Sequence, residues 1–189
     1  MQYAETAAKL AQYGQQIAEL RNRMRELQRS VEPEKVAGYE FSTAEGKVGL
    51  SELFGEKQYL IVIHNMGAGC RYCTLWADGF NGILPHIENR AGFVVASPDE
   101  PAVQQKFRTG RGWRFRMVSH RHTSFAEDMG YRGKDGWLPG VSVFVKQGER
   151  ICRVSDNRFG PGDDFCAIWH FFDLLPEGAD GWQPQYKYD

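Results

Sequence analysis

The feature that most constrains this 189-residue chain is a nearly continuous apolar run at Gln58–His64. The run, Gln-Tyr-Leu-Ile-Val-Ile-His, is typical of a strand that is covered on both faces of a sheet. A second run of this kind, Gly92–Ser97, follows a segment of helical character at residues 72–89. Two such strands joined by a helix predict an α/β layered fold.

The rest of the chain continues this alternation. Further strands are predicted at Tyr39–Ser42, Lys47–Leu50, Phe115–Ser119, Val141–Lys146 and Arg150–Val154, and further helices at residues 98–110, 124–129 and 164–175. The last two strands form a hairpin around Gln147-Gly148, so the central sheet has mixed strand direction. Gly79, Gly82 and Pro85 are expected to kink or divide the helix at 72–89.

Residues 1–31 have the pattern of a separate amphipathic helix, which Pro33 ends. Its apolar stripe has the spacing of a coiled coil and consists of Tyr3, Leu10, Ile17, Met24 and Val31, interleaved with Tyr13, Leu20 and Leu27 and interrupted at Thr6. The stripe is consistent with a homodimer or with packing on the chain's own domain. We therefore divide the chain into residues 1–35, the N-terminal helix, and residues 36–189, one α/β domain.

Composition excludes several classes of function. The formal net charge is −1, so no overall charge recruits nucleic acid or a membrane surface. The longest apolar run, Leu60–Ile63, is far shorter than the roughly 20 residues of a membrane span. No signal peptide is recognisable, and four cysteines are too few for a disulfide scaffold. These features predict a cytoplasmic protein, in which paired cysteines serve redox or metal chemistry.

The pair Cys70-Arg71-Tyr72-Cys73 carries the predicted chemistry. It follows the strand at 58–64 after a short Gly-rich connection and opens a helix, where free N–H groups and the helix dipole stabilise a thiolate. Cys70 is then the nucleophile and Cys73 the resolving thiol of thiol–disulfide exchange, with the charge of Arg71 favouring the thiolate. A metal site and a pair of inert thiols are the alternatives. His64 either faces the pair or is a core histidine.

Two other groups of residues are interpreted as structural. Cys152 and Cys166 are predicted to pack in the core, although with Cys70 and Cys73 they match the count of a four-cysteine zinc site. Segment 106–122 contains six Lys/Arg and no acidic residue, and its aromatic residues are expected to point inward while the arginines face water. Single-stranded nucleic acid, an acidic protein or an anionic thiol would be the ligand if this segment were a binding surface.

From Gly38 to its end the chain resembles the thioredoxin-like family catalogued as domain of unknown function 899, whose members are described as predicted dithiol–disulfide oxidoreductases. The residues that carry the resemblance are Leu50-Ser51-Glu52-Leu53-Phe54-Gly55, His64-Asn65-Met66, Cys70 and Cys73 with Trp76-Ala77-Asp78-Gly79-Phe80, Ser97-Pro98, Gly112-Trp113-Arg114-Phe115, Ser142-Val143-Phe144 and Asp173-Leu174-Leu175-Pro176-Glu177-Gly178. The helix at residues 1–31 also fits, since members of this family often begin with one.

The resemblance implies a thioredoxin-like three-layer α/β sandwich with a central mixed sheet and an added N-terminal helix. It also implies an oxidoreductase that needs no metal or nucleotide cofactor, takes a protein or small-molecule disulfide or thiol, and draws on an external thiol reductant. The residues expected to support Cys70 and Cys73 are His64, Arg71, Tyr72, Trp76 and Pro139. Pro139 is the candidate for the cis-proline that thioredoxin-like proteins place beside the dithiol.

The chain departs from related enzymes in two places. Arg71-Tyr72 stands where thioredoxins usually have Gly-Pro. Peroxiredoxins use a Pro-x-x-x-Thr-x-x-Cys motif, but Ile63 and Gly67 occupy its proline and threonine positions here. A thiol peroxidase is therefore the nearest alternative enzyme, and a redox-inert binding or assembly module is the alternative from another class.

Overall fold

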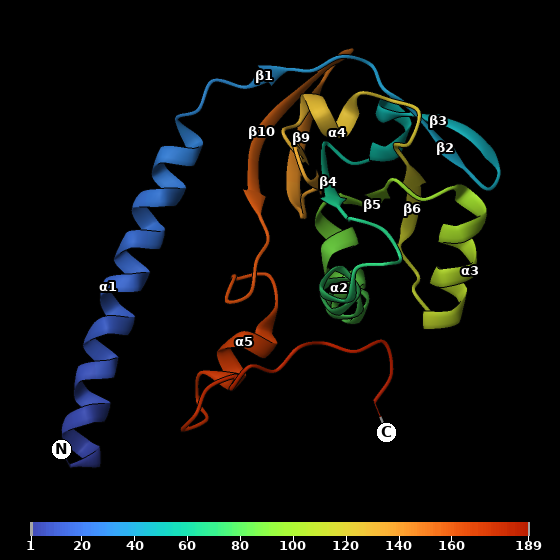
Figure 1. Cartoon of the computed structure of the whole chain (residues 1–189). Helices are drawn as coiled ribbons and strands as arrows, with labels where there is room; N and C mark the ends of the chain where they lie inside the picture. The colour runs from blue at the N-terminus through green and yellow to red at the C-terminus, as the bar shows by residue number, and fades with distance from the viewer. Residues whose placement is uncertain (1, 189) are drawn as a thin grey trace. The chain divides into compact units, whose positions relative to one another are not determined.

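The structure is a computed structural model that describes residues 2–188 (Figure 1). It forms two compact units that divide between Glu34 and Lys35. The first unit is helix α1 (Tyr3–Arg29), none of whose described residues is buried, and its predicted apolar stripe is exposed. The homodimer through this stripe and its packing on the chain's own domain both stay predictions. Among the helices within residues 2–188, none combines the length with the hydropathy that a membrane span requires.

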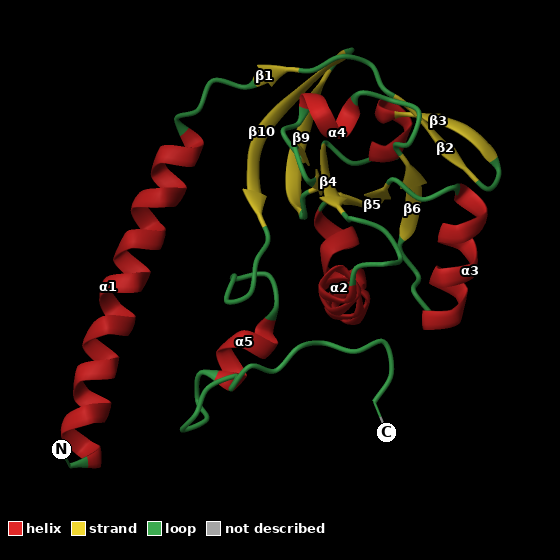
Figure 2. Ribbon diagram, in the orientation of Figure 1, coloured by secondary structure: helices red, strands yellow, loops and turns green. Residues whose placement is uncertain are grey.

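The second unit contains the sheet and the remaining helices (Figure 2). Its strands are β2 (Glu40–Thr43), β3 (Gly46–Gly49), β4 (Tyr59–His64), β5 (Gly92–Ser97), β6 (Arg116–Ser119), β7 (Arg132–Gly133), β8 (Gly136–Trp137), β9 (Gly140–Gln147) and β10 (Arg150–Arg158), preceded by the short β1 (Glu34–Lys35). Its helices are α2 (Arg71–Arg90), α3 (Pro101–Arg111), α4 (Phe125–Asp128) and α5 (Ala167–Phe172), with a 3-10 helix, η1, at Leu50–Phe54.

The main sheet has the order β1-β10-β9-β4-β5-β6-β2-β3. Strands β4, β5 and β6 are parallel neighbours, whereas β9 runs antiparallel to β4 and pairs with β10 as a hairpin. The mixed strand direction predicted from the sequence is therefore confirmed. Because β4 ends at His64 and β9 begins at Gly140 directly opposite it, the connections that follow β4 and precede β9 meet at one edge of the sheet.

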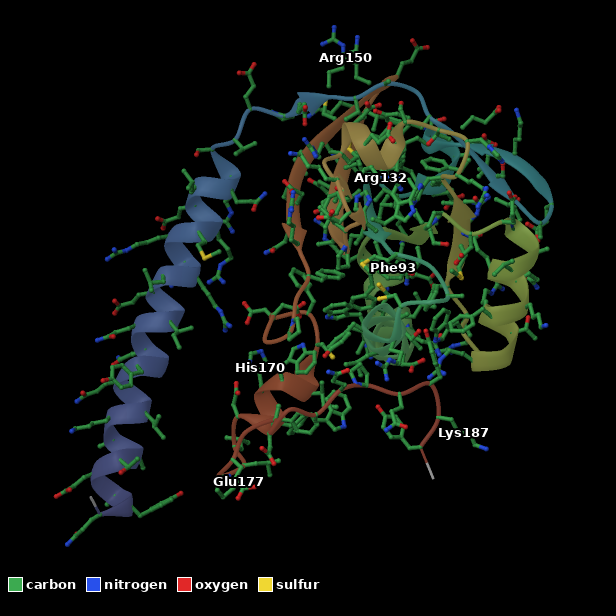
Figure 3. All side chains as sticks on the ribbon, in the orientation of Figure 1. Phe93, Arg132, Arg150, His170, Glu177 and Lys187 are labelled. Atoms are coloured by element: carbon green, nitrogen blue, oxygen red, sulfur yellow. The ribbon has the colours of Figure 1, made fainter. Side chains whose placement is uncertain are left out.

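Two separate hydrophobic cores cover the two faces of the sheet, as a three-layer sandwich requires. Alternate residues of β4 divide between them, with Leu60 and Val62 on one face and Ile61 and Ile63 on the other. The first core contains residues of η1 and α4, and the second contains residues of α2 and α5 together with Phe93 of β5, which lies among the densely packed side chains in Figure 3.

Helix α2 runs from residue 71 to residue 90 with Pro85 inside it, so of the expected kink or division the division is wrong. Pro85 has no N–H to donate to the carbonyl of Asn81, four residues earlier. The guanidinium of Arg114 donates to that carbonyl instead, at 3.1 Å, while the Asn81 side chain accepts from the backbone N–H of Arg114 at 2.8 Å. A residue from the next connection along the sheet thus replaces the hydrogen bond that the proline removes.

Candidate active site

Cys70 is the N-cap residue of α2, at the edge of the sheet where β4 ends. Its Sγ accepts a hydrogen bond from the backbone N–H of Cys73 at 3.0 Å, in the position that a serine or aspartate oxygen takes at most helix starts. The Sγ of Cys73 in turn lies 3.4 Å from the backbone nitrogen of Met66. The predicted cysteine pair is therefore at the start of a helix, the Cys73 sulfur contacts the loop that precedes it, and both thiols are free.

The loop that precedes Cys70 is held by Asp99, which follows strand β5. The carboxylate of Asp99 accepts the N–H of Ala68 at 2.8 Å and the hydroxyl of Ser97 at 3.3 Å. Gly67 has a φ of +105°, and a Cβ at this position would lie 2.9 Å from the Asp99 carboxylate. Only glycine meets both conditions without strain, so glycine is required at position 67 for the close approach of the carboxylate.

The two thiols have very different acidities. Hydrogen bonds from the Cys73 side chain and from the N–H groups of Cys73 and Tyr72 lower the pKa of Cys70 to about 7, against the opposing effect of burial. The hydrogen bond to Cys70, burial, and the charge on Cys70 raise the pKa of Cys73 well above its ordinary value. Cys70 is half-buried and Cys73 is buried. This difference favours Cys70 as the thiolate and keeps Cys73 protonated.

The side chains between and after the two cysteines face in different directions. Arg71 is exposed and donates to the side chain of Gln183 at 3.4 Å, and the causes that lower the pKa of Cys70 are hydrogen bonds rather than this guanidinium. Tyr72 stacks on Trp169 with ring centroids 6.2 Å apart. Trp76 is buried, and its indole N–H donates to Asp163 at 3.3 Å. Tyr72 and Trp76 therefore connect α2 to the C-terminal part of the chain.

His64 lies on the opposite face of the sheet from the cysteine pair, because Ile63 before it is the residue that shares a core with Cys73. Its ring stacks on Tyr131 with centroids 3.7 Å apart, and its Nε2 is 2.8 Å from the hydroxyl of Ser142. Burial lowers the pKa of His64 well below its usual value. Of the two sequence-based interpretations, the core histidine is the one that the structure supports.

Pro139 lies at the same sheet edge as the cysteine pair, because it precedes Gly140, which pairs with His64. Its peptide bond is trans, as are all peptide bonds among the described residues, so the expected cis-proline is not found. Its carbonyl accepts the N–H of Phe159. A Cβ on Gly140 would lie 2.2 Å from the ring of Tyr131, which explains why glycine follows the proline.

The remaining cysteines pack as the sequence predicts, since Cys152 and Cys166 are both buried. Within residues 2–188 no three His, Cys, Asp or Glu side chains are grouped so that they could hold a metal ion. In segment 106–122, Trp113 and Phe115 are buried and Arg116 is exposed, as expected for a strand with its aromatic residues inside.

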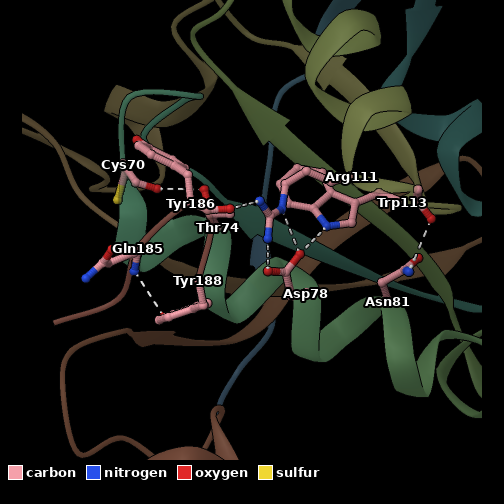
Figure 4. Close-up of polar contacts among 10 residues, drawn as sticks. Cys70, Thr74, Asp78, Asn81, Arg111, Trp113, Gln185, Tyr186 and Tyr188 are labelled. Carbon is pink, nitrogen blue, oxygen red and sulfur yellow. Dashed lines mark hydrogen bonds and ion pairs between the residues drawn. The ribbon is translucent and has the colours of Figure 1, made fainter. Parts of the chain in front are cut away.

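Sequence reasoning missed a polar network that connects α2, α3 and the C-terminal tail (Figure 4). Asp78 accepts hydrogen bonds from the indole N–H of Trp113 at 2.7 Å and from Nε of Arg111 at 2.9 Å. Arg111 also donates to the backbone carbonyl of Tyr186 at 2.9 Å, and the Tyr186 hydroxyl donates to the carbonyl of Ala68 at 3.0 Å. The tail has no periodic pattern, so the only available signal was its two tyrosines.

The fold is similar to solved peroxiredoxin structures. A cysteine-to-serine mutant of peroxiredoxin Q from Xanthomonas campestris matches with a TM-score of 0.54 and 19% identity, over 64% of this chain and 80% of that one. Peroxidoxin BcpB of Mycobacterium tuberculosis matches with a TM-score of 0.55 and 24% identity, over 67% of this chain and 84% of that one. A cysteine-to-serine mutant of PrxQ from Xylella fastidiosa matches with a TM-score of 0.58 and 17% identity, over 69% of this chain and 87% of that one. At these identities the likeness establishes the thioredoxin-like fold alone.

Comparison at the level of sequence gives the family. No curated protein matches the chain. A family model described as "Bacterial protein of unknown function (DUF899)" matches residues 2–188, which include the cysteine pair, the loop before it and the C-terminal tail. The chain therefore belongs to the DUF899 family, whose thioredoxin-like fold the structure displays.

Proposed function

We propose that this protein is a thiol–disulfide oxidoreductase in which Cys70 is the nucleophile and Cys73 the resolving thiol. The observation that carries the proposal is the hydrogen bonding of Cys70: the side chain and the backbone N–H of Cys73 both stabilise its thiolate at the start of α2. The peroxiredoxin-like fold supports thiol redox chemistry in general. The choice of a disulfide as substrate rests on the cysteine pair.

The exchange follows from the positions and acidities of the two sulfurs. The Cys70 thiolate attacks one sulfur of a substrate disulfide, and the other sulfur leaves as a thiolate. Cys73 then gives up its proton and attacks Cys70 in the mixed disulfide, which releases the second substrate thiol and leaves a Cys70–Cys73 disulfide. The substrate gains two electrons and the protein loses two. An external thiol reductant restores the dithiol by the same exchange, and reversal of these steps oxidises a dithiol substrate.

A thiol peroxidase is the second candidate, favoured by the structural neighbours. In this chain the residue three positions before Cys70 is Gly67, whose N–H donates to the side chain of Asn65, so no hydroxyl is present there to orient a peroxide. Near Cys70, helix α2 carries the hydroxyls of Thr74 and Tyr72. The Thr74 hydroxyl donates to the carbonyl of Cys70 at 3.0 Å, and the Tyr72 ring stacks on Trp169. Peroxide reduction would need an orienting hydroxyl that is absent at position 67, whereas disulfide exchange needs only the two cysteines. We therefore favour disulfide exchange.

A trapping experiment tests the proposal. The Cys73→Ser variant cannot resolve a mixed disulfide, so Cys70 should retain its partner as a covalent adduct that is released by reductant. The matched control is the double variant Cys70→Ser/Cys73→Ser, which should retain none. In parallel, the wild-type protein should consume a disulfide with a stoichiometric change in thiol content at Cys70 and Cys73. Consumption of peroxide but not of disulfide would favour the peroxidase, and absence of both reactions would favour the redox-inert module.

A further inference from the structure

The C-terminal segment 183–188, which we call the strap, holds the loop and helix on both sides of Cys70. On one side the Tyr186 hydroxyl donates to the carbonyl of Ala68 at 3.0 Å. On the other side the Gln183 side chain accepts from the guanidinium of Arg71 at 3.4 Å. Because Ala68 and Arg71 flank Cys70 in the chain, the strap passes beside the nucleophile, and Figure 4 shows Tyr186 next to Cys70.

The strap is anchored at a second place on the same framework. Arg111 of α3 donates to the Tyr186 backbone carbonyl while it is paired with Asp78 of α2. The Tyr186 ring meets the edge of Phe107 with centroids 6.2 Å apart, and Pro184 is buried. The strap therefore contacts α3 as well as α2, the helix that begins at the cysteine pair.

These contacts hold the strap in a defined position but leave it easy to release. Segment 183–188 forms no helix or strand, and Tyr186 itself is 40% exposed. A few hydrogen bonds near the surface are the kind of contact that opens locally without unfolding of the core. The Tyr186 phenol also interacts electrostatically with the cysteine pair, since burial and then the charges of Cys70 and Cys73 raise the pKa of Tyr186.

We propose that the strap determines which disulfides reach Cys70. While it is in place, a low-molecular-weight disulfide reaches the half-buried Sγ, but a protein disulfide does not, because its backbone would have to occupy the space beside Ala68 and Arg71. Release of the strap opens the site to protein disulfides. This inference rests on the exchange activity proposed above and adds the substrate class and its control.

The test compares reagents of different size on the full chain. Tyr186→Ala removes the hydroxyl and the ring, and Tyr186→Phe removes the hydroxyl alone. Lys187→Ala is the matched control, because Lys187 lies in the strap with its side chain directed away from the fold (Figure 3) and is exposed. The rates to be measured are those of exchange with glutathione disulfide and with the disulfides of insulin.

Loss of one hydrogen bond and its ring contact corresponds to about a tenfold change in the opening equilibrium. Tyr186→Ala should therefore raise the rate with insulin by about tenfold, with a smaller increase for Tyr186→Phe. The rate with glutathione disulfide should change by less than about threefold, as should both rates in Lys187→Ala. Equal changes for both substrates, or no change for insulin, would overturn the size filter.

A second measurement separates failure of this inference from failure of the exchange activity. Alkylation of Cys70 by iodoacetamide and by a polyethylene-glycol maleimide needs no disulfide substrate, and peptide mass spectrometry assigns the reaction to Cys70. The ratio of the bulky to the small reagent's rate should rise in Tyr186→Ala and stay constant in Lys187→Ala. A constant ratio in Tyr186→Ala refutes the proposed role of the strap even if disulfide exchange is observed. A raised ratio without any exchange refutes only the proposed exchange activity. Unreactive Cys152 and Cys166 confirm that each variant is folded.

Discussion

The acidity of Cys70 should be visible in its rate of alkylation as the pH is changed. A thiol with the ordinary pKa of 9.0 is about 1% ionised at pH 7, whereas a pKa of about 7 makes Cys70 half ionised, an advantage of about 50-fold. A more stable thiolate is a weaker nucleophile, and over two pKa units this lowers the intrinsic rate by about eightfold. The net expectation at pH 7 is a rate about sixfold above that of an ordinary exposed cysteine.

The assay measures the initial rate of iodoacetamide reaction at Cys70 from pH 5 to pH 10. In the wild-type chain the rate should rise with a midpoint near pH 7. Cys73→Ala removes the hydrogen bond that contributes most to the low pKa, so the midpoint should move upward by about one unit or more. Cys73→Ser keeps a hydroxyl donor at this position and should shift the midpoint less.

Cys152→Ala provides the control, because Cys152 is buried in strand β10 and should leave the midpoint near 7. The reasoning is refuted if the wild-type midpoint is about 9.0, the ordinary value used above. It is equally refuted if the profiles of the wild type and Cys73→Ala coincide, since the side chain of Cys73 would then have no part in stabilising the thiolate.

Four further outcomes can be measured. Arg114→Ala should lower the free energy of unfolding by about 1–2 kcal/mol, and by much less when Pro85→Ala restores the missing N–H donor; equal losses in both backgrounds would contradict this coupling. Gly140→Ala should lower the free energy of unfolding by about 3 kcal/mol or more, because its Cβ would overlap the ring of Tyr131 and the backbone carbonyl of Asn157. A denaturant midpoint equal to that of the wild type would contradict the close packing described at Gly140. Burial lowers the pKa of His120 to about 4, so the unfolded chain binds a proton between about pH 6.5 and 4 that the folded chain does not. The contribution of His120 to stability should therefore fall by about 3 kcal/mol across this range as the pH is lowered. His120→Gln should remove this contribution and leave that of the buried His64, whose pKa is also lowered. Deletion of residues 1–31 should halve the mass in light scattering if this helix forms the predicted dimer, and an unchanged mass would remove that interpretation.

The central strands of the sheet and the placement of the cysteine pair could be predicted from the sequence, for a physical reason. Strands β4 and β5 are uninterrupted apolar runs, and a Gly-rich loop followed by Cys70 marks the start of α2. The buried positions of Cys152 and Cys166 also follow from their elements. These features depend on local pattern, which a single sequence displays directly.

The features that were predicted wrongly or missed depend on contacts between distant residues. A strand covered on both faces does not reveal which face a given residue occupies, so the side of the sheet that His64 takes could not be decided. Pro85 indicates a broken helix unless the donor from Arg114 is known. The strap lacks any periodic pattern, and its position near Cys70 results from hydrogen bonds to residues more than 70 positions earlier in the chain.

The replacement of the missing Pro85 donor by Arg114 has a consequence for the order in which the chain assembles. The two partners are 33 positions apart, so in a nascent chain that ends shortly after residue 90 the carbonyl of Asn81 has only water as a donor. A peptide of α2 alone should therefore be less helical around this point, and the C-terminal half of the helix should become more stable once residue 114 has left the ribosome. Its N-terminal turns, which carry Cys70, do not depend on this late contact and should gain their structure earlier during synthesis.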